Sequence, residues 1–459
     1  MHSIGGADWG CLVAQTLMLL AIVSYEVSRP RGRNLLALLT CVALLTLVVG
    51  QTWWMFLQFS TGHIADFTHL NQYITIDAAR TANWYVCIAI VCFAIPYTVW
   101  SSSPLARIAP KNRVHSVVSS TRIVHLAYVA IAGLTLCATA GLIWSAGGIA
   151  AALTHPGLNW NGGVTMMMLV AGIGKLPYLH KLTRGVSPRR IDLALFALAF
   201  GMSLLNSRFI AAFILIQSAI IWNYCVREIT RRTLGLLTVA MFLVFIVFGL
   251  YRHFTSLPGS VVAIGNLMAF ASTAGSPIDW FYRLNIEGFA GLGGILTYQR
   301  AHGGLTHDFG LSSTAFVFQF VPNALRADPG SQIGMLQRHL TDAYPYPHGS
   351  VISPGLEIAY AHFGLVGVAG FGLVLAFLCS WIHRRLQQPR SDRLAVGIVS
   401  VHILQLVRGT FVLALFFALS ERIMIGVYRL LLAFSDARAF AGPVEQRMTI
   451  MSSFWGADH

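Results

Sequence analysis

Long uninterrupted apolar runs are the feature that most constrains this chain. A helix that crosses the roughly 30 Å hydrocarbon core of a bilayer needs about 20 mostly apolar residues, and such runs recur from one end of the sequence to the other. Hydrophobic residues make up 56% of the 459 residues and charged residues only 10%, whereas a soluble domain carries about 25% charged residues. The sequence therefore predicts an all-α, polytopic transmembrane bundle.

The runs predict about eleven membrane-crossing helices. The first run is followed, not preceded, by its basic cluster, so we expect a retained helix rather than a cleavable signal peptide. The predicted helices lie at 10–28, 34–57, 83–102, 121–143, 163–180, 191–205, 208–225, 233–251, 356–382, 394–415 and 419–435.

The distribution of basic residues predicts the orientation. Cytoplasmic loops are enriched in Lys and Arg, and the odd-numbered connections between the runs hold eighteen such residues, whereas the second and fourth connections hold only Arg80. We therefore expect the N-terminus outside, helices over 1–251, an extracytoplasmic loop domain over 252–355, helices over 356–435 and a cytoplasmic tail over 436–459. The basic residues are Arg29, Arg31, Arg33, Arg107, Lys111, Arg113, Arg122, Lys181, Arg184, Arg189, Arg190, Arg227, Arg231, Arg232, Arg384, Arg385, Arg390 and Arg393.

The same distribution argues against nucleic acid as a partner, although the formal net charge is +14. The basic residues lie between apolar runs rather than on one soluble face. All seven cysteines lie inside or at the ends of those runs, which disfavours a disulfide framework and a zinc site. We expect no cofactor and no metal.

We expect the segment 252–355 to lie outside the membrane and to hold reactive residues, because charges, prolines and turn residues interrupt its short apolar stretches. His302, His307 and Asp308 share a glycine-containing stretch but match no established metal-ligand spacing. Solvated loop histidines are favoured there over a polar substrate contact, and a metal site is the least favoured alternative.

Ionisable residues at membrane depth are the sharper functional signal, because an ionised side chain there costs several kcal/mol unless it meets a partner or a cavity. Arg208 lies in a short turn at the predicted outer mouth, Arg408 in the outer half of a late helix, and Glu357 at the start of the helix after the loop domain. Lys175 lies near a predicted cytoplasmic helix end, where a lysine can reach water. Arginines at the outer boundary suit an anionic headgroup such as a lipid diphosphate. The alternatives are that Arg208 caps its turn and that Arg408 pairs with Glu421 or a backbone carbonyl.

Four stretches resemble the bacterial O-antigen polymerases, the Wzy-type oligosaccharide repeat-unit polymerases. LLNSRFIAAFILIQSAII resembles that family's serine-arginine turn before an apolar helix, and FQFVPNALRADPG is similar to its stretch of proline and basic residues. SPGLEIAYAHFGLVGVAGFG resembles its acidic helix start followed by Phe-Gly, and LQLVRGTF its late Arg-Gly. The likeness covers about the C-terminal half. O-antigen ligases usually carry a His-Asn or His-Ser pair about ten residues before paired glycines, whereas here Ser353 lies at that distance from Gly364 and Gly367, with His348 further back.

The resemblance implies a metal-independent glycosyltransferase at the outer face of the bacterial inner membrane. It would join oligosaccharide repeat units carried on undecaprenyl diphosphate, with membrane lipids around it and a chain-length regulator as a further partner. On this reading Arg408 stabilises the departing diphosphate and Glu357 is the catalytic base, with His348 as its competitor. Arg208 binds the diphosphate, and Arg283 and Arg326 are substrate contacts of the loop domain.

Other functions remain open from the sequence. A transporter or flippase for lipid-linked glycans is the main alternative, although the sequence shows neither the paired broken helices nor the repeated halves of many transporters. A ligase, an acyltransferase or another lipid-linked-sugar glycosyltransferase is also consistent with the residues, and Asp66 and Asp77 give the last of these slight support.

Overall fold

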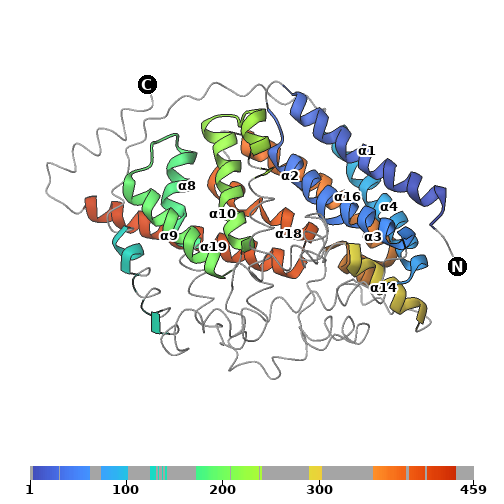
Figure 1. The fold of residues 1–459 in the computed structure, drawn as a ribbon. Coiled ribbons are helices and arrows are strands. Elements are labelled where there is room, and N and C mark those ends of the chain that lie inside the picture. Colours follow the sequence, from blue (N-terminus) through green and yellow to red (C-terminus); the bar gives the residue numbers. More distant parts are fainter. Residues whose placement is uncertain are drawn as a thin grey trace, which may run out of the picture.

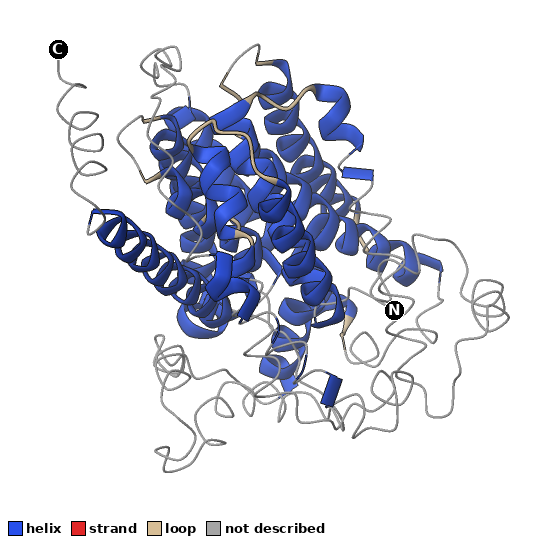
Figure 2. Cartoon of the chain, turned by 90° about the vertical axis from the view of Figure 1, so that its left-hand side faces the viewer, coloured by secondary structure: helices blue, strands red, loops and turns tan. Residues whose placement is uncertain are grey.

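The computed structural model is helical throughout the part of the chain that it describes (Figures 1 and 2). Apart from single positions, it describes residues 4–29, 32–61, 74–101, 125–130, 172–206, 208–236, 289–301, 355–388, 392–408 and 411–440. No strand occurs in these segments, so the all-α prediction is confirmed for them. Most of the predicted loop domain at 252–355 lies outside the described residues.

Four helical stretches are long and apolar enough to cross a membrane. They are α1 (Gly6–Ser28), the continuous run of α2 (Leu35–Ala43), η1 (Leu44–Val49) and α3 (Gly50–Thr61), α4 (Ile76–Ser101), and α16 (Gly355–Gln387). Large apolar side chains project outward from them: Leu17 is 60% exposed on α1 and Val99 is 63% exposed on α4. Four spans with outward apolar faces support a membrane protein, and the count of eleven stays a prediction.

The remaining described helices are shorter, with the exception of α19. They are α8 (Leu176–Thr183), α9 (Arg190–Asn206), α10 (Arg208–Ile221) with its π-helical extension η4 (Trp222–Val226), α14 (Phe289–Ala301), α17 (Arg393–Val399), α18 (His402–Arg408) and α19 (Phe411–Phe440).

Two late boundaries differ from the prediction. The run at 394–415 was expected to be one helix, but a turn at Ser400 and Val401 divides α17 from α18, and α18 ends at Arg408. The expected break between 415 and 419 does not occur, because α19 continues without interruption from Phe411 to Phe440. Apolar composition could not reveal either point, since both sides of each boundary are equally apolar.

Gly364 folds α16 back on itself. Its backbone has φ 60° and ψ −141°, a combination that is almost restricted to glycine. In a straight helix Ala359 and Gly367 would lie about 12 Å apart, yet a Cβ on Gly367 would overlap the carbonyl oxygen of Ala359. A short arm, 355–363, therefore packs against a longer arm, 365–387, and carries Glu357 into the interior.

Two hydrophobic cores meet along α10 and the α17–α18 pair. The first core joins α1, α2, η1, α4, α14 and α16, and the second joins α8, η4, α17 and α19. α10 contributes Ile216 and Ile220 to the first core and Ile221 to the second. Likewise Ile398 of α17 belongs to the second core and Val401 to the first. The helices at this boundary thus connect the two halves of the bundle.

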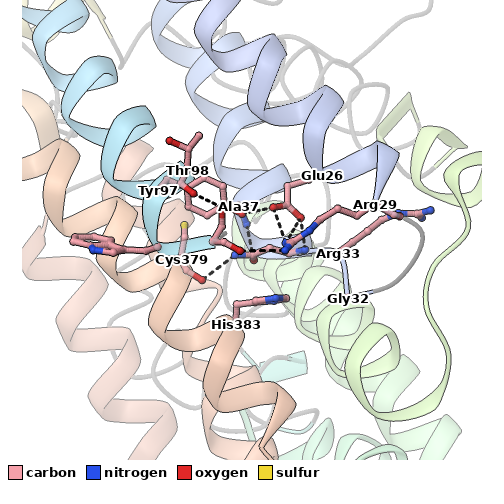
Figure 3. Close-up of polar contacts among 12 residues, drawn as sticks. Glu26, Arg29, Gly32, Arg33, Ala37, Tyr97, Thr98, Cys379 and His383 are labelled. Carbon is pink, nitrogen blue, oxygen red and sulfur yellow. Dashed lines mark hydrogen bonds and ion pairs between the residues drawn. The ribbon is translucent and has the colours of Figure 1, made fainter. Parts of the chain in front are cut away.

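Polar contacts around Glu26 (Figure 3) lie at one end of the bundle, where connections that the positive-inside pattern assigns to one side come together. The buried carboxylate of Glu26 accepts from Arg29 at 3.1 Å and from the Tyr97 hydroxyl at 2.7 Å. The first connection reaches the seventh, because the Gly32 amide donates to Glu228 at 2.5 Å. It also lies near the ninth, because the amide nitrogen of Gln387 would lie 3.5 Å from a Cβ on Gly32.

The opposite end brings together the N-terminus, the second connection and α14. Asp8 of α1 accepts from Arg80 of α4 at 2.7 Å, and Arg300 of α14 donates to Thr81 at 2.7 Å. The start of α4 also contacts α14, as the Thr75 amide donates to the Thr297 hydroxyl at 3.2 Å. These groups were all predicted to share the outer side. Which end faces the cytoplasm stays a prediction.

Candidate functional site

Arg208 and Arg408 lie at adjacent helix ends. α10 and α17–α18 run antiparallel, with Gln217 donating to the Ile398 carbonyl at 2.9 Å and the Phe213 ring 5.9 Å from the His402 ring. The first residue of α10 lies five residues before Phe213, and the last residue of α18 lies six residues after His402. Those terminal residues are Arg208, whose backbone alone is described, and Arg408. The register therefore places the two backbones at a similar level.

The short arm of α16 begins at the same end. A Cβ on Gly355 would overlap the carbonyl oxygen of Leu406, so the two backbones touch, and only glycine permits this approach. Leu406 lies two residues before Arg408, and Glu357 lies two residues after Gly355. The Glu357 side chain is fully buried. Glu357 and Arg408 thus belong to segments that are in direct contact, although the two residues are far apart in the sequence.

Two helix N-termini also converge there, those of α10 and α16. The C-termini of α9 and α18 lie at the same end, so the helix dipoles largely offset one another and the positive charge there comes from the two arginines. Three of the six predicted site residues are therefore brought to one end of the bundle. The other three, His348, Arg283 and Arg326, lie outside the described residues, as do His302, His307 and Asp308.

A second polar group lies deeper, and we call it the buried quartet: Lys175, Gln217, His402 and Glu421. The Lys175 ammonium donates to Glu421 at 2.5 Å and to Gln217 at 2.7 Å. His402 lies 2.7 Å from the other Glu421 oxygen, and Gln217 donates to the same carboxylate at 2.9 Å. The quartet joins the start of α8 with α10, α18 and α19 (Figure 1).

The buried quartet contradicts the prediction made for Lys175. Lys175 was expected to extend to water from a helix end, but it is only 3% exposed and is neutralised by Glu421. The prediction was wrong because the snorkelling argument considers a single helix against lipid, whereas here three neighbouring elements enclose the side chain. The partners that the structure shows for Glu421 are Lys175, Gln217 and His402 rather than Arg408.

Interrupted helices border the quartet on two sides. Pro177 has no amide to donate to Ile173, and the Tyr128 hydroxyl donates to that carbonyl instead. At the turn between α17 and α18, the side chain of Gln217 donates to the Ile398 carbonyl. Side chains thus satisfy backbone groups that an unbroken helix would satisfy itself.

Sequence reasoning missed Gln217 and His402 as members of a site. Each is one of a few polar residues in an apolar run, and the four members come from four separate elements, so no spacing along the chain connects them. The detectable signal was a polar side chain within each apolar run, but such side chains are common in helical cores. Within the described residues no group of three or more His, Cys, Asp or Glu side chains is arranged to hold a metal ion.

Comparisons with models of known families, with curated proteins and with solved structures found no match to this chain.

Proposed function

We propose that this protein is a membrane glycosyltransferase that joins oligosaccharide repeat units carried on undecaprenyl diphosphate. The observation that carries the proposal is the convergence of Arg208, Arg408 and Glu357 at one end of the bundle. These residues come from separate parts of the sequence, and their residue types match the two charge requirements of the reaction, a cationic site for the leaving group and a base for the attacking hydroxyl.

The chemistry divides between the arginines and the carboxylate. The bond between the anomeric carbon of the donor glycan and its diphosphate oxygen breaks, and a bond forms from that carbon to a hydroxyl oxygen of the acceptor glycan. Guanidinium groups at the α10 and α18 ends stabilise the charge that develops on the departing lipid diphosphate. Glu357 accepts the proton of the attacking hydroxyl. The reaction requires neither a metal nor a nucleotide.

The location of this end supports an extracytoplasmic reaction. The α10 start, the α18 end and the α16 start all face the side that the basic connections predict to be outside. On this proposal the protein resides in the bacterial inner membrane, with the loop domain contributing Arg283, Arg326 and His348 to the glycan site. A chain-length regulator is the expected protein partner.

Deletion of the gene tests the reaction class. The proposal predicts loss of long polymer and accumulation of single repeat units on the lipid carrier at the outer face. Restoration by the wild-type gene is the control. Normal polymer length in the deletion strain would remove the proposal.

A transporter for lipid-linked glycans is the second candidate, and the buried quartet favours it. Many transporters place charged side chains beside interrupted helices within the membrane, and the breaks near Pro177 and Ser400 bring such helices to Lys175 and Glu421. The same deletion separates the candidates. A transporter defect leaves the lipid-linked units facing the cytoplasm, where an impermeant glycan-modifying enzyme does not reach them in intact spheroplasts.

A further inference from the structure

The exposed face formed by α4 and α16 changes in polarity along its length in the same order as a phospholipid, from acyl chain to headgroup. One face of α16 carries four exposed residues, because they follow one another at spacings of three and four. They are Val374, Phe377, Trp381 and Arg385. The stripe is apolar over one to two turns, then aromatic, then cationic. Acyl chains, the interfacial layer and the headgroup phosphate follow each other in the same order.

The neighbouring helix supplies the other half of this face. Ile95 and Val99 of α4 are 59% and 63% exposed, and they lie one turn apart on the same face of that helix. α4 and α16 touch closely, since a Cβ on Gly372 would overlap the Ala89 carbonyl oxygen. Trp100 packs edge-on against Phe377 with ring centroids 6.2 Å apart, so the two apolar stripes are continuous.

Guanidinium groups surround the end of this face. Arg384 donates one bond to the Trp100 carbonyl at 3.1 Å, and Arg29 donates to the next carbonyl, Ser101, also at 3.1 Å. The guanidinium of Arg385 lies 5.5 Å from the Trp381 ring centroid. Arg384 and Arg385 are exposed. A guanidinium carries five N–H donors, so the bond from Arg384 to the Trp100 carbonyl leaves other donors of this side chain for a phosphate.

We infer that this face binds an anionic phospholipid of the leaflet on the basic side of the membrane. The acyl chains would lie along the apolar stripes of α4 and α16, and the phosphate would contact Arg384 and Arg385 beside Trp381. Charge complementarity selects an anionic lipid over a zwitterionic one, because each basic residue near a headgroup layer contributes about 1 kcal/mol toward anionic lipid. The inference does not depend on the proposed glycosyltransferase activity.

Lipid retention by the full-length protein tests the inference. The protein is reconstituted in nanodiscs of equal parts phosphatidylethanolamine and phosphatidylglycerol, and the lipids that remain bound after release are identified by native mass spectrometry. Wild-type protein is expected to retain phosphatidylglycerol preferentially. Arg384→Gln and Arg385→Gln are each expected to lower that preference about fivefold, while Arg384→Lys keeps most of it.

Arg422→Gln is the matched control, since Arg422 is also an exposed arginine, with its side chain 57% exposed, but lies on α19. It should leave the preference unchanged. Trp381→Leu retains the charge but removes the aromatic ring, and it provides a second variant if an arginine variant folds poorly. Equal retention of the two lipids by wild-type protein, or an equal loss in Arg422→Gln, would overturn the inference.

Discussion

Glu421 is the residue on which the buried quartet depends, because it accepts hydrogen bonds from the other three members. Replacing it by glutamine leaves the Lys175 ammonium enclosed without a counter-charge. Removing one partner of a buried pair typically costs about 3–5 kcal/mol. We therefore expect Glu421→Gln to lower the free energy of unfolding by roughly that amount, measured by denaturant unfolding in detergent.

The double variant Lys175→Met, Glu421→Gln separates pairing from simple loss of packing. Its destabilisation should be clearly smaller than the sum of the two single variants, since no unpaired charge remains. Arg422→Ala is the control, because its exposed pair with Asp392 is expected to contribute about 1 kcal/mol or less. Additive single effects would show that the quartet is not electrostatically coupled.

Asp392 gives a prediction on pH. Burial alone would raise its pKa, but hydrogen bonds from Arg429, the Ala395 amide and Arg422 outweigh burial and hold the pKa below its ordinary value. A carboxyl with a depressed folded-state pKa stabilises the fold above its unfolded pKa, about 3.9, and loses that contribution as the pH falls through the folded value.

Accordingly, Asp392→Asn should lower the free energy of unfolding by about 1 kcal/mol near neutral pH. The difference from wild type should persist down to about pH 4 and shrink below it. Unfolding curves over this pH range provide the measurement. A difference that grows on acidification would contradict the proposed pairing.

Some of the site residues could be predicted from the sequence, and others could not. Arg208, Arg408 and Glu357 could be selected because a charge in an apolar run is conspicuous and costly. The partners of Lys175 could not be predicted, because they depend on which helices pack together. A lone Gln217 or His402 carries no information about a carboxylate on a distant helix.

At the scale of elements, the α16 hairpin depends on Gly364. A residue that carries a Cβ is strained by about 1–3 kcal/mol in this backbone conformation, φ 60° and ψ −141°. We expect Gly364→Ala to destabilise the protein by that amount and to displace the arm that carries Glu357. Gly370→Ala, on the same helix, is the control because nothing lies within 4 Å of its added Cβ. Equal melting temperatures of the two variants would refute the hairpin.

Elements were predictable from the sequence where apolar runs are bounded by charge. α1 and α2 through α3 follow their predicted spans closely because basic or polar residues interrupt the chain at 29–34. α4 begins at Ile76, earlier than the expected residue 83, because the Thr75 hydroxyl accepts from the Ala78 amide and Asp8 pairs with Arg80. The reversal at Gly364 escaped prediction, since a glycine in an apolar run is equally compatible with a straight helix.

At the scale of the whole molecule, the sidedness can be tested by labelling. In a background without the seven cysteines, Arg300→Cys on α14 and Arg231→Cys beyond η4 provide two exposed positions at opposite ends. An impermeant thiol reagent should label position 300 in intact spheroplasts and position 231 only after permeabilisation. The reverse pattern would invert the predicted orientation and move the candidate site to the cytoplasmic face.

The overall arrangement was only partly accessible from the sequence. The alternation of basic connections anticipated which ends would meet, and the contacts among Gly32, Glu228 and Gln387 agree with it. The division into two cores joined by α10 and α17–α18 could not be anticipated. It arises from helix packing between segments that have no common periodicity.

The most direct test of the central claim is the effect of Arg408→Ala on polymer and lipid-linked intermediate in cells with matched protein levels. Arg408→Ala is expected to give short or absent polymer and accumulated single repeat units on the lipid carrier, while Arg422→Ala retains wild-type polymer length. Wild-type polymer length in the Arg408→Ala strain would contradict the assignment of this helix end as the diphosphate site.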